Sequence, residues 1–323
     1  MLRVGYPATI DVKLLREFPE GVELIPISET MDHDVEIEVW IPDPYSTRAM
    51  RAWPHLRGVK LVLALMAGTE WIPATVGRHV TICNARGAHN ISTAEWTLAA
   101  MLAMLKYFPL YLDVQRSGVW KRRFEAAALY AELHREGRKV YPPVLGEELT
   151  GKSVLLVGYG AIGKEIERML GPFAVEMIRV ARTARNEPEV HAVSELHELL
   201  PWAEVMVLIL PATAESRGLI GARQLELMRQ GALLINAARG PIVDTDALVA
   251  ALQAGRIRAA IDVTDPEPLP EGHPLWSCPN LLITPHVGGS TPQFAPRALR
   301  VAADELRRYM KGEPLRNVVQ AAV

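Results

Sequence analysis

Apolar residues along the chain follow two different spacings, and segments with the two spacings alternate. Near the start, four short runs have the β-branched and aliphatic composition of strands, namely LRVGY, VELIPI, VEIEVWI and VKLVLAL. The intervals IDVKLLREF and STRAMRAWPHL have helical spacing instead. Strands that alternate with helices are typical of an α/β unit with a parallel sheet, so we expect such a unit at the start of the chain.

A second alternating series runs from GKSVLLVGYGAIG to NLLITPHVGG. Its six apolar runs are SVLLVG, EMIRVA, EVMVLIL, ALLINA, RAAIDV and NLLITP. Six strands with helical spacers between them are what a doubly wound, Rossmann-type nucleotide-binding domain requires. The expected fold is therefore α/β, with a Rossmann-type domain inserted into a smaller, flavodoxin-like α/β substrate domain.

Two long helical segments flank the second series. AHNISTAEWTLAAMLAMLKY predicts a long helix, and Ser92 with Glu95 has the spacing of a capping box at its start. STPQFAPRALRVAADELRRYMKGEP predicts a C-terminal helix, and no strand of the second series follows it. It is therefore expected to return to the first unit. Residues 1–93 and 290–323 would then form a discontinuous substrate domain around a dinucleotide-binding domain of residues 94–289.

Residues 112–150, here called the arm, differ in composition from both series. The segment DVQRSGVWKRRFEAAALYAELHREGRKVYPP is charged and carries Trp120 among polar residues. One interpretation is a solvated helix and loop. The other is a dimerisation arm that packs on a second subunit, where an exposed aromatic side chain would be covered.

Composition and charge argue against several classes of protein. A hydrophobic share of 49% with 22% charged residues suits a folded globular chain, and a formal charge of −2 argues against a broad nucleic-acid footprint. Cys83 and Cys278 are the only cysteines, so no disulfide framework is implied and a reducing compartment is expected. The N-terminal segment lacks the unbroken apolar core of a signal peptide, and no apolar run is long enough to span a bilayer. We expect a cytoplasmic protein with neither a membrane nor a nucleic acid as partner.

The segment VGYGAIG, at the end of the first strand of the second series, indicates dinucleotide binding. Gly158 is expected to make the tight turn, Gly160 to let the backbone approach a pyrophosphate, and Gly163 to let strand and helix pack closely. The following helix, KEIERML, would offer free N–H groups and its dipole to the anion. A purely structural turn is the alternative.

The end of the second strand bears on which dinucleotide binds. An acidic residue about 20 positions beyond the glycines would accept a hydrogen bond from the ribose 2′-hydroxyl of NAD. Arg182 stands there instead, nineteen residues after Gly163. An arginine cannot accept, but it can bind a 2′-phosphate, and Thr183 and Arg185 can assist it. We therefore expect NADP(H) to be preferred, with NAD(H) as the weaker cofactor; a solvated basic loop is the alternative.

Polar groups follow three later strands of the series. Arg239 follows ALLINA, and His286 follows NLLITP. Asp262 lies near the end of RAAIDV, and Glu267 follows that run. The carboxyl ends of parallel strands face the ligand crevice, so these groups should converge where the nicotinamide lies. A single histidine after a strand would more often be structural, but three such groups at successive strand ends favour a functional site. Glu267 would orient the imidazole and raise its pKa.

Together these segments resemble the D-isomer-specific 2-hydroxyacid dehydrogenase family, which includes glyoxylate and hydroxypyruvate reductases. The segments that carry the resemblance are VGYGAIG, LPATAESRGLIG, LMRQGALLINAARGPIVDTDALVAAL, IDVTDPEPLPEGHPLW and ITPHVGGST, in the family's order and spacing over nearly the whole chain. The resemblance implies an NAD(P)-dependent oxidoreductase that reduces small 2-keto acids, such as glyoxylate or hydroxypyruvate, to D-2-hydroxy acids. It also favours a homodimer.

The resemblance implies roles for single residues as well. Arg239, Glu267 and His286 match the catalytic residues, and Asp262 matches a residue that meets the nicotinamide carboxamide. The loop ALMAGTEW matches the one whose N–H groups hold the substrate carboxylate. The expected cofactor-binding residues are Gly158, Gly160, Ala161, Ile162, Gly163, Arg182, Thr183, Arg185, Pro211, Thr213, Ala237, Ala238, Asp262 and Gly288. The expected substrate-binding residues are Met66, Ala67, Gly68, Arg239 and His286, and no metal is expected.

The same motifs are compatible with two other functions. A dinucleotide-sensing regulatory protein of the same fold would keep the cofactor motif but turn over keto acids slowly. A family member could instead act on another substrate, such as phosphite, formate or 3-phosphoglycerate. A panel of substrates separates these cases, because pocket size depends on side chains that only folding brings together.

Overall fold

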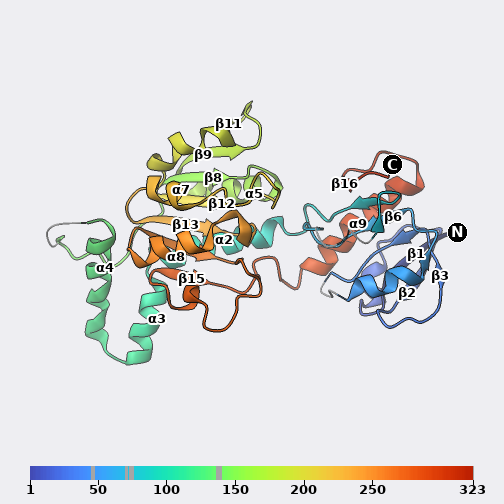
Figure 1. Ribbon diagram of the computed structural model, residues 1–323, viewed down its shortest axis with the longest axis horizontal. Coiled ribbons are helices and arrows are strands. Elements are labelled where there is room, and N and C mark those ends of the chain that lie inside the picture. The colour runs from blue at the N-terminus through green and yellow to red at the C-terminus, as the bar shows by residue number, and fades with distance from the viewer. Residues whose placement is uncertain (45–47, 70–71, 73–75, 136–139, 323) are drawn as a thin grey trace. The chain divides into compact units, whose positions relative to one another are not determined.

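The computed structural model (Figure 1) describes the chain except for residues 45–47, 70–71, 73–75, 136–139 and 323. Its contacts divide the chain into two compact units. Unit 1 comprises Met1–Asn90 and Ser290–Val323, and unit 2 comprises Ile91–Gly289. The first boundary thus lies three residues before the one expected at residue 93.

Unit 1 is built on a sheet of six strands among the described residues, in the order β16-β7-β6-β4-β1-β2. All neighbouring strands are parallel except β16, which runs antiparallel to β7. The order β2-β1-β4-β6-β7 has the flavodoxin-like pattern 2-1-3-4-5. The bounds are β1 Leu2–Pro7, β2 Val22–Ile27, β4 Val39–Trp40, β6 Leu61–Leu63, β7 Thr81–Cys83 and β16 Val318–Gln320.

Some elements of unit 1 differ from the predictions. The run VEIEVWI divides, because β3 (Val35–Glu36) pairs with β5 (Leu56–Arg57) in a separate small sheet, while β4 joins the main one. The two helical intervals form only the short 3-10 helices η1 (Val12–Leu15) and η2 (Ala49–His55). Pro54 lies inside η2 and lacks the N–H that a longer helix needs.

The C-terminal helix α9 (Phe294–Met310) belongs to unit 1. Its buried face includes Ala298, Leu299 and Leu306, which pack in one core with Val4 and Leu61 of the sheet. The helix is strongly amphipathic because its apolar face covers the sheet of unit 1 and its polar face is in contact with solvent.

Unit 2 contains an eight-stranded sheet within its described residues, in the order β10-β11-β9-β8-β12-β13-β14-β15. Only the β10–β11 pair is antiparallel. The order β11-β9-β8-β12-β13-β14 is the 3-2-1-4-5-6 of a doubly wound fold, with its reversal between β8 and β12. The bounds are β8 Ser153–Val157, β9 Glu176–Ala181, β10 Arg185–Asn186, β11 Glu189–Ala192, β12 Val205–Leu208, β13 Ala232–Asn236, β14 Ile257–Ile261 and β15 Leu281–Ile283.

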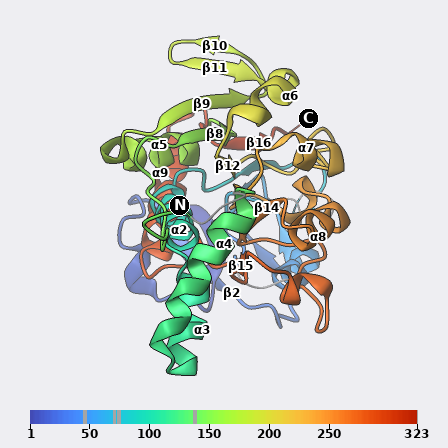
Figure 2. The same ribbon diagram turned by 90° about the vertical axis from the view of Figure 1, so that its left-hand side faces the viewer.

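Helices cover both faces of this sheet (Figure 2). Helices α2 (Asn90–Leu105) and α5 (Ala161–Leu170) pack in one core, and α6 (Leu196–Leu199), α7 (Ala222–Leu227) and α8 (Thr245–Gln253) pack in the other. Strands β8, β12, β13 and β14 are buried at every residue. Burial on both faces explains why these strands are continuous apolar runs rather than alternating ones. The α/β fold class is confirmed, with all six predicted strands of the second series present.

The predicted capping box at the start of α2 is wrong. The helix begins at Asn90, and Ser92 lies inside its first turn, where it is 4% exposed. The arm follows, with α3 (Phe108–Ser117), η3 (Trp120–Phe124) and α4 (Glu125–Leu133). Among the described residues no single helix is long and apolar enough to cross a bilayer, and only the bent pair of α2 and α3 passes that test by length and composition.

Candidate active site

The glycine-rich loop between β8 and α5 adopts a shape that only glycine allows at two positions. Gly158 has φ +112°, and a Cβ there would lie 2.3 Å from the carbonyl oxygen of Ile209. A Cβ on Gly163 would lie 2.6 Å from the carbonyl oxygen of Gly158, which shows how closely helix and strand approach. A Cβ on Gly160 would meet nothing within 4 Å, so the loop is open to a ligand there.

The N-terminus of α5 offers backbone donors to that open space. Gly160 is the N-cap and contributes no side-chain hydrogen bond. The first N–H groups of a helix have no acceptor within it, so those of Ala161, Ile162 and Gly163 are available to an anion. Together with the helix dipole they form a site of the kind that holds a pyrophosphate. The residues present therefore fit a dinucleotide cofactor.

The basic loop predicted to read the adenosine ribose begins directly after β9. Arg182 and Thr183 are exposed. Arg185 is also exposed, but its Nη2 donates to the carbonyl of Tyr159 at 3.1 Å, and its guanidinium lies 5.6 Å from the Tyr159 ring centroid. Because Tyr159 lies within the glycine-rich loop, the contacts of Arg185 stabilise that loop. Arg182 is the first residue after β9.

The loop after β12 places an acidic residue near Arg182. Ser216 Oγ donates to the carbonyl of Pro211 at 2.8 Å and accepts from the N–H of Thr213 at 2.8 Å, which closes the loop. A hydrogen bond with Thr213 lowers the pKa of the exposed Glu215 below its usual value, and the charge of Arg182 acts in the same direction. Sequence analysis did not single out Glu215, because nothing in its own segment shows that the charge of Arg182 acts on it.

A buried asparagine shapes the loop that carries Arg239. Asn236 ends β13 and is 1% exposed. Its Oδ1 accepts from the N–H of Ala238 and its Nδ2 donates to the carbonyl of Arg239, each at 3.0 Å. The Arg239 Nη1 donates to the carbonyl of Ala238 at 2.8 Å. Sequence reasoning missed Asn236, although a polar residue that closes a fully apolar run is a recognisable signal.

Glu267 and His286 form a direct pair at the carboxyl ends of β14 and β15. The His286 Nδ1 lies 2.5 Å from Glu267 Oε1. This hydrogen bond raises the pKa of His286 above its ordinary value, and the charge of Arg239 opposes the rise. The same bond lowers the pKa of Glu267, and Arg239 adds to that lowering. The structure thus brings these three side chains within electrostatic reach of one another.

Asp262 is engaged with the loop that carries His286. Its carboxylate accepts from the N–H of Val287 at 2.9 Å, the N–H of Gly288 at 2.8 Å and the Thr284 hydroxyl at 2.5 Å. Its backbone carbonyl accepts from the N–H of His286 at 2.7 Å. The family resemblance implies a nicotinamide contact for Asp262, but the structure shows a carboxylate already surrounded by donors from its own unit.

The predicted carboxylate-binding loop lies in unit 1, just beyond the carboxyl end of β6. The carbonyls of Met66 and Ala67 accept from the N–H of Ala85 and from Asn84 Nδ2. Within the described part of the chain, no acceptor is found for the N–H groups of Met66, Ala67 and Gly68. Residues 70 and 71 of the predicted loop lie outside the described residues.

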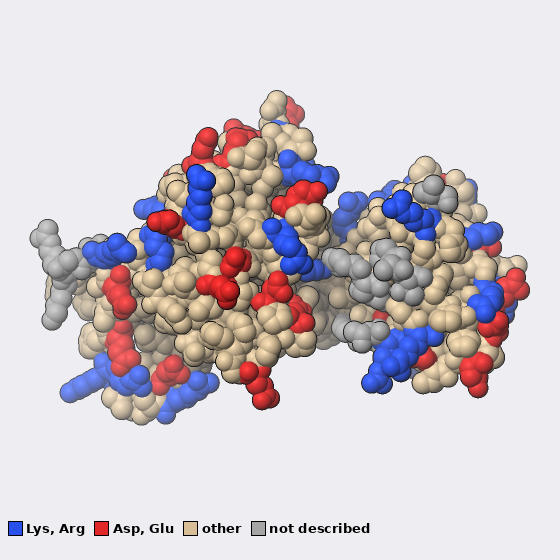
Figure 3. Space-filling view, viewed as in Figure 1, with Lys and Arg blue, Asp and Glu red and all other residues tan. Residues whose placement is uncertain are grey.

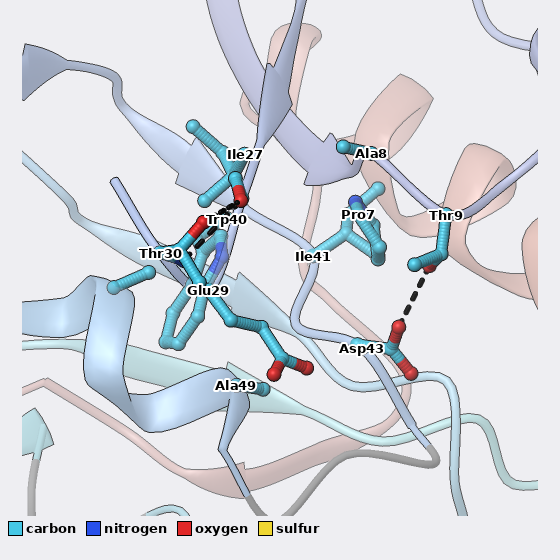
Figure 4. Close-up of a pocket in the computed structure, with 12 residues that line it drawn as sticks. Pro7, Ala8, Thr9, Ile27, Glu29, Thr30, Trp40, Ile41, Asp43 and Ala49 are labelled. Atoms are coloured by element: carbon cyan, nitrogen blue, oxygen red, sulfur yellow. Dashed lines mark hydrogen bonds between the residues drawn. The ribbon is translucent and has the colours of Figure 1, made fainter.

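Unit 1 also contains a pocket of about 240 Å³ at the carboxyl ends of β1, β2 and β4 (Figure 4). Trp40 and Ile41 contribute apolar lining, and Thr9 donates to Asp43 at 2.7 Å. Glu29 turns its carboxylate into the pocket (Figure 4). None of the residues predicted for the active site lines it, so this pocket is not part of the candidate site.

The described residues form no candidate metal site, and the face shown in Figure 3 has no large patch of a single charge. Over residues outside the masked segments, no group of three or more His, Cys, Asp or Glu side chains could hold a metal ion. On the face shown in Figure 3, basic and acidic side chains are interspersed over each unit. This mixture agrees with the formal charge of −2.

Comparison with known proteins gives the family. Residues 98–288 match the family model described as D-isomer specific 2-hydroxyacid dehydrogenase, NAD binding domain. The chain is 30% identical to glyoxylate reductase from Aeropyrum pernix over 95% of this chain and 94% of that protein. It is 31% identical to D-3-phosphoglycerate dehydrogenase from Methanocaldococcus jannaschii over 77% of this chain, but this match spans only 44% of that longer relative.

Solved structures are similar over nearly the whole chain. One is a D-isomer specific 2-hydroxyacid dehydrogenase from Xanthobacter autotrophicus in complex with NADPH and MES, at 26% identity and a TM-score of 0.76, covering 98% of both chains. Another is an NADPH-dependent glyoxylate/hydroxypyruvate reductase from Sinorhizobium meliloti in complex with NADP and malonate, at 25% identity and a TM-score of 0.73. The latter match covers 98% of this chain and 96% of that one.

The fold, the cofactor cradle and these matches define a nicotinamide-dependent oxidoreductase of the class that acts on CH–OH groups. The chain belongs to the D-isomer specific 2-hydroxyacid dehydrogenase family.

Proposed function

We propose that this enzyme reduces small 2-keto acids, such as glyoxylate or hydroxypyruvate, to D-2-hydroxy acids and prefers NADPH. The observation that carries the proposal is the Glu267–His286 pair, 2.5 Å apart and under the influence of the Arg239 charge. Such a set provides a proton donor, a carboxylate that orients it and a cation for developing negative charge. Relatives named glyoxylate reductase support this substrate class.

Each of the three side chains has a distinct task in the proposed reduction. A bound reduced nicotinamide supplies the hydride. Arg239 binds the substrate carboxylate and stabilises the negative charge that develops on the carbonyl oxygen. His286 donates the proton to that oxygen from Nε2, because its Nδ1 faces Glu267. Glu267 keeps the ring oriented and favours the imidazolium form; in the oxidative direction, neutral His286 accepts the proton at the same atom.

We retain the loop of Met66, Ala67 and Gly68 as a proposed carboxylate-binding element. Its N–H groups, which lack acceptors among the described residues, support this proposal. So does its position at the carboxyl edge of a parallel sheet, where α/β proteins bind ligands.

A steady-state panel tests the proposed function. Glyoxylate, hydroxypyruvate, pyruvate and longer 2-keto acids are assayed with NADPH and with NADH, beside phosphite, formate and 3-phosphoglycerate with the oxidised cofactors. Turnover should be highest on a small 2-keto acid with NADPH. Higher turnover on phosphite, formate or 3-phosphoglycerate would reject the substrate class, and tight dinucleotide binding without turnover on any of them would indicate a sensor.

The first residue-level prediction concerns cofactor choice. Arg182→Ala should weaken NADPH binding about tenfold or more, because a hydrogen bond to a charged group contributes roughly 1.5–3 kcal/mol. NADH binding should change little. Glu215→Gln should act in the opposite direction, since it removes a negative charge near Arg182 that repels a 2′-phosphate.

Fluorescence titration of both cofactors measures these changes. Arg168→Ala is the matched control, because Arg168 is an exposed arginine of the same unit that pairs with Glu165 on α5. Equal losses for NADPH and NADH in Arg182→Ala, or a wild type that prefers NADH, would contradict the assignment.

We also propose a homodimer formed through the arm. Large apolar side chains are exposed there, with Trp120 at 77%, Leu112 at 51%, Val119 at 49% and Phe124 at 46%. Large exposed apolar side chains that gather in one segment support a protein contact there. Light scattering at micromolar concentration should give a dimer mass, and Trp120→Ser combined with Phe124→Ser should shift it toward the monomer. A monomeric wild type rejects the proposal.

A further inference from the structure

We infer that Trp96 and Thr284 are positioning residues for the reaction: they hold the Asp262 carboxylate so that it keeps the backbone of His286 in its left-handed conformation. The inference rests on the proposed role of His286. It concerns side chains that neither the sequence motifs nor the family resemblance singled out.

Three polar groups from three different segments form a chain of hydrogen bonds with a fixed direction. Trp96 Nε1 on α2 donates to Thr284 Oγ1 at 3.0 Å, and Thr284 Oγ1 donates to Asp262 Oδ1 at 2.5 Å. An indole N–H can only donate, so the Thr284 oxygen must accept from Trp96. The hydroxyl hydrogen is then directed to the Asp262 carboxylate. The tryptophan thus sets the orientation of the threonine, and the threonine sets that of the aspartate.

The aspartate in turn organises three consecutive backbone N–H groups. His286 has φ +54°, a left-handed conformation that is strained for a non-glycine residue and persists only where its surroundings hold it. Its N–H donates to the Asp262 carbonyl, while those of Val287 and Gly288 donate to the two Asp262 carboxylate oxygens. A left-handed residue turns successive N–H groups toward one side, which makes a concave anion-binding nest. The nest here is filled by the chain's own carboxylate.

Packing around the nest leaves little freedom for an alternative arrangement. Gly288 is buried, and a Cβ added to it would lie 2.9 Å from Asp262 Oδ2 and 3.1 Å from Trp96 Cγ. The indole ring therefore lies directly against the nest while its N–H acts through Thr284. The hydrogen bonds from Trp96 through Thr284 to Asp262 are here called the clamp. Helix α2 packs in the core of the sheet that carries β14 and β15, so the clamp is anchored on a rigid element.

Because His286 is the first residue of the nest, the backbone conformation held there determines where its ring points. Its ring must point toward Glu267 through Nδ1 and leave Nε2 for the substrate. The charged groups that act on its ring are Glu267, Arg239 and Asp262. If the backbone of His286 leaves the left-handed region, the ring turns away from Glu267. The pKa of His286 should then fall, and the rate of proton donation should fall with it.

Thr284→Val tests the clamp, because valine keeps the shape of threonine but removes the hydroxyl. We expect kcat for 2-keto acid reduction to fall about tenfold or more, the usual effect of losing a hydrogen bond to a charged group. The pKa of His286, followed by NMR of the histidine ring and assigned with the His286→Ala variant, should be lower than in the wild type.

Matched variants separate the clamp from a general structural effect. Thr284→Ser keeps the hydroxyl and should restore both kcat and the His286 pKa. Trp96→Phe keeps a ring but removes the N–H donor, and should move both quantities in the direction of Thr284→Val. Ser277→Ala removes a hydroxyl that donates to the carbonyl of Pro274, and should leave both quantities at wild-type values.

Two results would overturn the inference: a folded Thr284→Val enzyme with the wild-type kcat and His286 pKa, or a Thr284→Ser enzyme as impaired as Thr284→Val. If Thr284→Val does not fold, Trp96→Phe decides by the same two readouts. The NMR readout needs no substrate. An inactive wild type would therefore reject the proposed function while leaving the clamp to be judged by the His286 pKa.

Discussion

His286→Ala should lower kcat for 2-keto acid reduction by roughly 10²–10⁴, which is the usual contribution of a positioned general acid. The variant loses the imidazole that pairs with Glu267 at 2.5 Å, while the cofactor cradle at Gly160 and α5 is untouched. NADPH affinity measured by fluorescence titration should therefore remain at the wild-type value. His197→Ala is the matched control, because His197 is an exposed histidine of unit 2 that hydrogen-bonds to Gln224. A His286→Ala enzyme with wild-type kcat would reject the assignment.

The pH dependence of the same reaction tests whether Glu267 controls the pKa of His286. Glu267 raises the pKa of His286, so reduction in the wild type should persist to a higher pH than an unpaired imidazole would allow and then fall as His286 loses its proton. Glu267→Gln removes the charge and lowers that pKa. The alkaline limb of kcat/KM for reduction should move to lower pH, and oxidation should appear at lower pH as well.

Glu271→Gln serves as the control for this shift, because Glu271 is an exposed carboxylate in the same connection between β14 and β15. It should leave both profiles in place. Profiles that do not move in Glu267→Gln would mean that this carboxylate does not govern the protonation of His286.

Arg239→Gln should reduce kcat/KM for reduction by a similarly large factor, about 10²–10³, because it removes the cation proposed to stabilise the developing oxyanion. The loop that carries Arg239 is fixed independently of its guanidinium, since the Asn236 amide holds the Ala238 N–H and the Arg239 carbonyl. The fold should therefore survive the substitution, which thermal unfolding can verify.

Arg239→Lys separates charge from geometry. Lysine keeps the positive charge but cannot bind a carboxylate through two parallel N–H groups. We expect partial activity with a raised KM for the keto acid. An Arg239→Lys enzyme as impaired as Arg239→Gln would show that the paired N–H groups matter more than the charge, and a fully active Arg239→Gln enzyme would remove Arg239 from the mechanism.

The sequence alone was sufficient for features that depend on local pattern. Strands such as β8 and β13 are buried at every residue, so their apolar runs stand out, and all six strands of the second series were placed. The local geometry of the VGYGAIG glycines could also be predicted: Gly158 makes a turn at positive φ, Gly163 lies at a close approach of helix and strand, and Gly160 faces open space. Arg239, Glu267 and His286 could be predicted as catalytic because ligands bind at the carboxyl ends of the strands in parallel α/β sheets.

Features that depend on contacts between distant segments were decided only by tertiary structure. Ser92 has the spacing of a cap but lies inside α2, because packing of the helix outweighs a weak local signal. Arg182 and Glu215 follow different strands, β9 and β12, yet the charge of Arg182 acts on the Glu215 carboxylate. Trp96 and Thr284 are 188 residues apart in the sequence and share one hydrogen bond. A residue's type and its neighbours predict which groups it can bind, but the partner that it binds is determined by how strands and helices stack, and no local pattern records that.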